Sequence, residues 1–154
     1  MKRTLLMTLA TFTVLVLSAT AAQAQSGHFV GTPTCTDIGT QLQCSGKVAG
    51  LGGTTFQITV DADATAITEC ENPAGNVAPG QDFDFDATGT TGPLDTPRNG
   101  QFRFSLTSDA PEAPADSCPN PKWTASVLDV EFGDATITLF EDGNVSDIIT
   151  VPVS

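Results

Sequence analysis

A run of alternating carboxylates, Asp82-x-Asp84-x-Asp86, is the pattern in this sequence closest to a ligand site. The same spacing opens an EF-hand calcium loop, which also requires glycine at its sixth position and a bidentate glutamate at its twelfth. Those two positions hold Ala87 and Pro93 here, so the EF-hand motif fails.

On a β-strand, these three carboxylates would instead line one face, about 7 Å apart. Such a row repels itself, and a Ca²⁺ ion that bridges to Asp61 or Asp63 on a neighbouring strand would relieve the repulsion. The simpler interpretation is a solvated face that discourages edge-to-edge pairing of strands. We prefer the simpler interpretation and keep a calcium site as the alternative.

Catalytic chemistry has little support in the sequence. There is no G-x-S-x-G motif, and the single histidine, His28, lies near the expected N-terminus of the mature chain, a poor place for a general base. A carboxylate pair for glycoside hydrolysis can always be proposed among 18 acidic residues, so it has no specificity. We expect no catalytic residues and no cofactor, and a secreted hydrolase or protease inhibitor is the weakest alternative.

The four cysteines, Cys35, Cys44, Cys70 and Cys118, form an even set without the close Cys-x-x-Cys spacing of a zinc site. In an oxidising compartment such a set predicts two disulfides, for which three pairings exist. Only a short turn-like stretch separates Cys35 from Cys44, so the economical arrangement pairs these two and leaves Cys70 with Cys118. The second bridge would contribute about 4 kcal/mol in the chain-entropy model.

Residues 1–24 predict a cleavable secretory signal. A positive start at Lys2 and Arg3 precedes an apolar stretch of about 13 to 15 residues, which is too short to span a bilayer. Ala22-Gln23-Ala24 then fits the small-residue rule for cleavage. We expect a single domain over 25–154, located in the periplasm or outside the cell and without a membrane span.

The mature chain is strongly acidic. Loss of Lys2 and Arg3 with the signal leaves 130 of the 154 residues and moves the net charge from −12 to −14. Such a charge repels nucleic acid and anionic lipid, so nucleic-acid binding is excluded. The sequence has no Tyr and one Trp, and most Phe residues alternate with polar residues as core positions do. An extracellular or envelope protein or a glycan is the expected partner.

Alternation of apolar and polar residues dominates the chain and predicts half-buried β-strands. Such runs include Thr55–Ala64, Asp82–Asp86 and Gln101–Thr107, and no stretch of helical length shows a 3.6-residue period. Counted along the chain, seven or eight short strands with turn signals between them predict an immunoglobulin-like two-sheet sandwich.

The C-terminal part predicts a three-stranded meander. Strands over Ser126–Phe132 and Ala135–Glu141 would be joined by a turn at Gly133-Asp134. Asp142-Gly143 is the strongest hairpin signal in the chain, because both central positions of such a turn favour positive φ. It would lead into a last strand over Val145–Val151.

Two connections, Glu71–Gln81 and Ser108–Pro121, are too rich in proline to be central strands. If Cys70 pairs with Cys118, the Asn-Pro steps beside these cysteines lie together at one end of the sandwich. The candidate interaction residues there are Asn72, Pro73, Asn120, Pro121 and Trp123. The simpler interpretation is that these residues only fix two loops.

The same two connections carry related motifs. These read Cys70-x-Asn72-Pro73-x-Gly75-Asn76-x-Ala78-Pro79-Gly80-Gln81 and Cys118-Pro119-Asn120-Pro121-x-Trp123. Together with the short signal, they resemble a group of small exported bacterial proteins of uncharacterised function. The resemblance covers most of the mature chain and implies a bacterial extracytoplasmic protein. It brings no functional residues, because the group has no assigned activity. The Cys35–Cys44 pair lies outside its motifs.

These observations together predict an exported, acidic, non-catalytic module that acts through its surface in an interaction or structural role.

Overall fold

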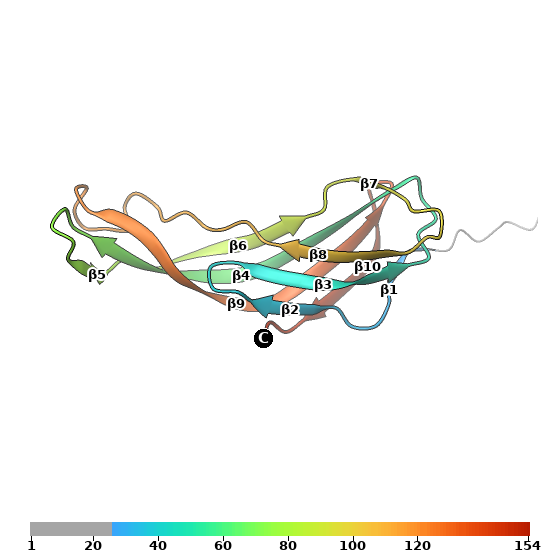
Figure 1. Cartoon of the computed structure of the whole chain (residues 1–154), viewed down its shortest axis with the longest axis horizontal. Coiled ribbons are helices and arrows are strands. Elements are labelled where there is room, and N and C mark those ends of the chain that lie inside the picture. The colour runs from blue at the N-terminus through green and yellow to red at the C-terminus, as the bar shows by residue number, and fades with distance from the viewer. Residues whose placement is uncertain (1–25) are drawn as a thin grey trace, which may run out of the picture.

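The computed structural model describes residues 26–154, so the predicted signal peptide lies outside the described residues. The described part of the chain is all β, without a helix, and none of it forms a helix suited to crossing a membrane. Figure 1 shows its elongated shape. The strands are β1 (His28–Phe29), β2 (Thr34–Asp37), β3 (Leu42–Ala49), β4 (Thr55–Glu71), β5 (Val77–Pro79), β6 (Phe83–Thr90), β7 (Leu94–Asp95), β8 (Phe102–Thr107), β9 (Thr124–Glu141) and β10 (Asn144–Val151).

The strands form two antiparallel sheets. In the four-stranded sheet, β3 pairs with β1 and β2 along one edge and with β8 along the other. In the six-stranded sheet, β4 pairs with β9 along one edge and with β7, β6 and β5 in succession along the other, and β10 follows β9. The predicted two-sheet sandwich is therefore confirmed, with ten strands instead of seven or eight.

The two sheets differ in length, and this difference shapes the molecule. β4 has 17 residues and β9 has 18, whereas no strand of the four-stranded sheet exceeds eight. At about 3.3 Å per residue, β4 and β9 run for about 56 Å, far beyond a strand of usual length. Alternate burial continues along β4 well past Ala64, where the sequence predicted its end. The small sheet thus covers only part of the large one (Figure 1).

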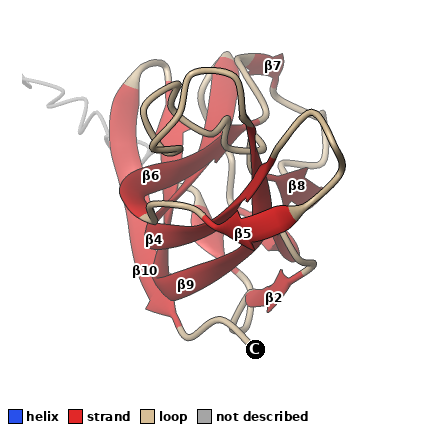
Figure 2. Cartoon of the chain, turned by 90° about the vertical axis from the view of Figure 1, so that its left-hand side faces the viewer, coloured by secondary structure: helices blue, strands red, loops and turns tan. Residues whose placement is uncertain are grey.

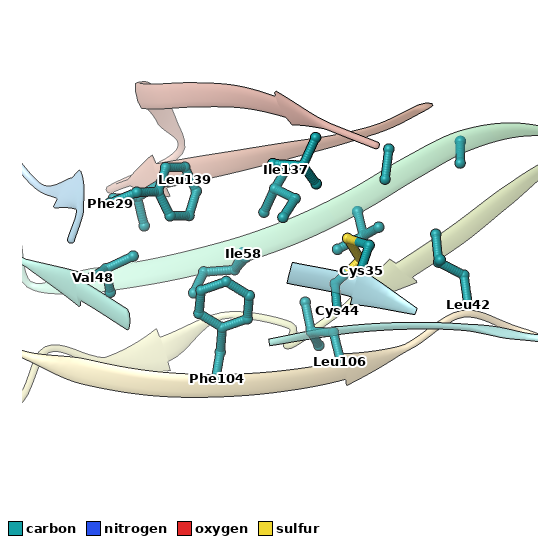
Figure 3. Packing of buried hydrophobic residues seen from close by; sticks show 14 of the residues in the cluster. Phe29, Cys35, Leu42, Cys44, Val48, Ile58, Phe104, Leu106, Ile137 and Leu139 are labelled. Atoms are coloured by element: carbon teal, nitrogen blue, oxygen red, sulfur yellow. A yellow bond between two sulfur atoms is a disulfide. The ribbon is translucent and has the colours of Figure 1, made fainter. Parts of the chain in front are cut away.

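Where the sheets face each other they enclose the main core, and we call this part the main body (Figure 3). Large apolar side chains from both sheets meet here, among them Leu42, Phe56, Ile137 and Leu139, all at most 2% exposed. The rings of Phe29 and Phe104 pack edge to face, with centroids 6.1 Å apart. Burial of such side chains is the main source of folding free energy in a sandwich.

Beyond the small sheet, the six-stranded sheet continues alone, and we call this part the extension (residues 64–71, 77–87 and 124–132). Its core comes from β4, β6 and β9 only and consists of Ala64, Ala66, Ala87 and Val130, with half-buried Phe83, Phe85, Val127 and Phe132 around them. Figure 2 views the molecule from this end.

The Ser108–Pro121 connection runs beside the extension in place of a second sheet (Figure 1). Asp109 N–H donates to the Thr88 carbonyl at 2.9 Å, and Gln81 N–H donates to the Ser117 carbonyl at 2.9 Å. Cys118, at its far end, is disulfide-bonded to Cys70. The connection is therefore held to the large sheet at several points instead of protruding from it.

Both predicted disulfides are confirmed. Cys35 and Cys44 are direct cross-strand partners on β2 and β3, with Cα atoms 4.1 Å apart, and they lie in the main core. The Cα atoms of Cys70 and Cys118 are 5.8 Å apart, in the extension.

The predicted turn at Gly133-Asp134 is wrong. The two residues form a β-bulge inside β9, because Phe132 pairs with Ala64 and Ala135 pairs with Ala62 on the same continuous partner strand. The hairpin at Asp142-Gly143 is confirmed, with φ of 47° and 80° at its two central residues.

Candidate functional site

One face of the six-stranded sheet is acidic. Along β4 the even-numbered side chains from Phe56 to Cys70 are buried, so the odd-numbered ones point to the opposite, outer face. Exposed or half-buried carboxylates from β4, β6 and β9 gather there, and we call this set the acidic face. Its members are Asp61, Asp63, Glu69, Glu71, Asp84, Asp86, Asp129, Glu131 and Asp134.

Charge is divided between the two sheets. The strands of the six-stranded sheet contain no Lys, Arg or His, whereas Lys47 and Arg103 lie on the four-stranded sheet, as does His28. The acidic face therefore has no cation within its own strands to neutralise it.

Strand register determines which carboxylates are neighbours. Asp63 lies directly opposite Asp86 across the β4–β6 pair, whereas Asp61 lies opposite Thr88. Asp84 lies opposite Thr65, whose hydroxyl donates to Asp84 Oδ1 at 2.8 Å. Like charges directly opposite each other on a sheet destabilise it, so the Asp63–Asp86 pair is a point of repulsion on the acidic face.

A shallow, solvent-open depression of about 670 Å³ lies at the centre of the acidic face. Asp63, Asp84, Asp86, Glu131 and Gly133 are among the residues that line it. A second depression of about 320 Å³ adjoins it and shares Asp63 and Asp86. The two residues of the β9 bulge, Gly133 and Asp134, thus each line one of the depressions.

Of the five residues predicted for a calcium site, the structure brings four onto this face. Asp82 is the exception, because it precedes β6 and its Oδ1 accepts a hydrogen bond from the Thr68 N–H at 3.0 Å. Within residues 26–154, no three acidic, histidine or cysteine side chains are grouped closely enough to hold a metal ion. The calcium site stays a prediction.

The predicted interaction loops lie at the far end of the extension, on either side of the Cys70–Cys118 bridge (Figures 1 and 2). Asn72 Oδ1 accepts hydrogen bonds from the N–H groups of Ala74 and Asn76, both at 2.9 Å. Asn120 Oδ1 accepts one from Lys122 N–H at 3.0 Å. Pro73 and Pro121 are exposed and Trp123 is half-buried. The asparagine side chains thus stabilise their own turns.

Sequence reasoning missed a group of carboxylates around the β9–β10 hairpin. Glu141 accepts hydrogen bonds from Gly27 N–H at 2.6 Å, Gly52 N–H at 2.8 Å and the Ser146 hydroxyl at 2.7 Å. Asp142 accepts from Thr54 and Thr55 N–H groups, and Asp147 accepts from Phe29 N–H at 2.9 Å. No local signal could reveal these contacts, because Gly27 and Glu141 are 114 residues apart.

These contacts change the acidity of two groups. Partial burial acts to raise the pKa of Glu141, but the hydrogen bonds from Ser146 and from three backbone N–H groups outweigh it and lower that pKa. Backbone hydrogen bonds from Thr55 and Thr54 lower the pKa of Asp142. In their ionised form, these two carboxylates therefore hold the N-terminal residues and the β3–β4 loop in place by hydrogen bonds.

Comparison of the chain with protein-family models, with curated proteins and with solved structures finds no match. The fold and the site define a class: an all-β, two-sheet domain with two disulfides and one acidic face. The resemblance to small exported bacterial proteins stays a prediction.

Proposed function

We propose that this protein is an exported, non-catalytic interaction module that binds an extracellular or envelope partner through its acidic face. The observation that carries the proposal is the separation of charge: nine carboxylates share one face of a sheet whose strands contain no basic residue. Unneutralised charge of one sign attracts a partner of the opposite sign and raises its rate of encounter.

The disulfides support the extracytoplasmic part of the proposal. Both pairs are formed, and no cysteine in residues 26–154 is free. Disulfides persist in oxidising compartments such as the periplasm and the extracellular space.

The position of the one histidine supports a non-catalytic role. His28 lies on β1 in the four-stranded sheet, where it is exposed, and its Nδ1 is 3.4 Å from the Ser26 carbonyl oxygen. It thus lies on the other sheet from the acidic face, so it offers that face no general base. Ser108–Pro121 is held along the extension by backbone hydrogen bonds and the Cys70–Cys118 disulfide, so it does not protrude as the binding loop of an inhibitor would.

A matched pair of variants tests the proposal. Asp84→Asn, Asp86→Asn and Glu131→Gln together remove three of the nine negative charges of the acidic face, at its central depression. Asp109→Asn, Glu112→Gln and Asp116→Asn give the same net charge by changes elsewhere. We expect the first variant to bind the source organism's envelope fraction about tenfold more weakly than wild type at low salt, and the second to bind normally. Equal loss in both, or turnover in a broad hydrolase panel, would overturn the proposal.

A calcium-stabilised module is a second candidate, favoured by the Asp63–Asp86 pair alone. A divalent cation between these two carboxylates would replace repulsion with attraction. Millimolar Ca²⁺ should then raise the melting temperature of wild type, EDTA should reverse the rise, and Asp86→Asn should abolish it. An unchanged melting temperature in wild type would eliminate this candidate.

A further inference from the structure

β9 has an open edge. β4 pairs with β9 from Thr124 to Glu141, but β10 covers the other edge only from Ala135 to Glu141. Over Thr124–Asp134, that second edge has no strand partner in the part of the chain that the structure describes. Figure 1 shows this half of β9, in orange, running past the end of the small sheet.

The arrangement at the end of β10 explains why the edge stays open. Val151 forms the last pair with β9, and Pro152, which follows, has no N–H to continue the ladder. The chain then crosses to the four-stranded sheet, where Ser154 N–H donates to the Cys35 carbonyl at 3.1 Å. The end of the chain therefore lies beside β2 and does not continue along β9 over Thr124–Asp134.

Other edges of the sandwich are partly covered. Residues 27–29 contact β10 through Ser146 and Asp147, and β6 receives the hydrogen bond from Asp109 N–H. An unpaired edge normally carries Lys or Pro that blocks the addition of a foreign strand. The open half of β9 has neither. It has two β-bulges, and β4 pairs with β9 on both sides of each of them.

The open edge presents a different chemistry on each face. Asp129 and Glu131 lie opposite Ile67 and Thr65, which places them on the acidic face. Val127 and Phe132 lie opposite Thr68 and Ala64 on the inner face, where they are only half-buried. Leu128, at one bulge, is 61% exposed.

Cross-strand neighbours on a sheet prefer opposite charges on one face and apolar partners on the other. A strand that complements this edge therefore alternates basic and apolar residues. A second copy of β9 would instead place carboxylates beside carboxylates, which opposes self-pairing.

We propose that the open edge of β9 over Thr124–Asp134 binds an extended segment of another protein, in which basic and apolar residues alternate, as an added strand of the six-stranded sheet. The inference rests on the proposed interaction function and names its partner class and its mode of binding. Backbone hydrogen bonds give such complexes their affinity, and alternate side chains give them specificity.

The test uses the disulfide-bonded mature protein and a capped peptide of alternating lysine and valine as long as Thr124–Phe132. A peptide of the same composition with its lysines and valines in two blocks is the control for charge alone. We expect the alternating peptide to slow amide exchange within Thr124–Asp134 and to bind at least about tenfold more tightly than the block peptide.

Two variants of equal charge locate the contact. Asp129→Lys with Glu131→Lys should weaken binding of the alternating peptide about tenfold or more, whereas Asp109→Lys with Glu112→Lys should leave protection of Thr124–Asp134 in place.

The unfavourable outcomes are distinguishable. If both peptides bound equally and slowed amide exchange around Asp61, Asp63 and Asp84, strand addition would be overturned. The acidic face would remain as an interaction surface. Absence of binding by both peptides would overturn strand addition, and the acidic face would still be judged by its binding of the envelope fraction. Concentration-dependent dimers that protect the same β9 amides would show that a second copy, and not a foreign strand, occupies the edge.

Discussion

The main body and the extension are stabilised in different ways, although β4 and β9 run through both. The main body has two sheets and buries Phe, Ile and Leu side chains between them, whereas the extension has one sheet and a core of three alanines and a valine. Each buried alanine contributes less transfer free energy than a buried leucine or phenylalanine, because it removes less apolar surface from water. The extension therefore depends more on its disulfide and on its contacts with Ser108–Pro121.

The largest effect should come from the extension's disulfide. Cys70→Ala with Cys118→Ala opens a loop with a sequence separation of 48 and should cost about 4 kcal/mol in the chain-entropy model. Denaturant unfolding measures the loss, and amide exchange should rise first in 64–71 and 124–132. The matched variant, Cys35→Ala with Cys44→Ala, opens a separation of 9 and should cost about 3 kcal/mol. If amide exchange in the Cys70→Ala, Cys118→Ala variant rose first in the main body, the extension would not depend on its disulfide in this way.

The next largest effect should come from truncation of a buried side chain in the core of the main body. Ile137→Ala, at a fully buried position of the main body, should destabilise the protein by about 3 kcal/mol through lost transfer free energy and a residual cavity. Ile148→Ala is the control, because Ile148 is 56% exposed, and it should change the unfolding midpoint little. A small loss in Ile137→Ala would show that the main core is not the principal source of stability.

Acid should weaken the main body through Glu141. Its pKa is lowered in the folded protein, so the stabilisation is present above the pKa of the unfolded chain and is lost as pH falls through the folded value. Glu141→Gln should lower the free energy of unfolding by about 1 kcal/mol at neutral pH, a modest loss because solvent partly screens this half-exposed carboxylate. The variant should also show a smaller fall in melting temperature on acidification than wild type. Glu112→Gln serves as the control on an exposed acid. Parallel pH curves for Glu141→Gln and wild type would refute this role.

The smallest effect should be a gain in stability on the acidic face. Asp63→Asn removes one of two like charges that lie directly opposite and should stabilise the sheet by about 0.5 kcal/mol at low ionic strength. Added salt should shrink the gain, because it screens the repulsion in wild type. Asp84→Asn is the matched control, since Asp84 faces Thr65 and accepts its hydroxyl hydrogen bond. A stabilisation of equal size in the control would show that only net charge matters.

Local pattern was sufficient for several features of this fold. The alternation in Thr55–Ala64 predicted a half-buried strand, and Asp142-Gly143 predicted the hairpin that the structure contains. The same local reasoning failed at Gly133-Asp134, where glycine beside aspartate indicates a turn. Continuous pairing of β9 with β4 overrides that signal, so Gly133 and Asp134 form a β-bulge within β9.

The candidate site was less predictable than the fold. The sequence grouped Asp82, Asp84 and Asp86 by spacing, but Asp82 bonds to Thr68 N–H, and Glu131 and Asp134 join the face from β9. These two carboxylates follow the alternation of a different strand, so their proximity to Asp63 depends on register. Register is a property of paired strands and cannot be inferred from one strand alone.

The sequence by itself determined the all-β class, the economical pairing of the four cysteines and the excess of negative charge. Each follows from short-range features: the two-residue period of a pleated strand, the separation of cysteines along the chain and composition. Tertiary structure alone decided which carboxylates face one another, which N–H groups Glu141 binds and which half of β9 is left open. These depend on contacts between residues far apart in the chain, because strand register and edge pairing form only when distant strands pack together.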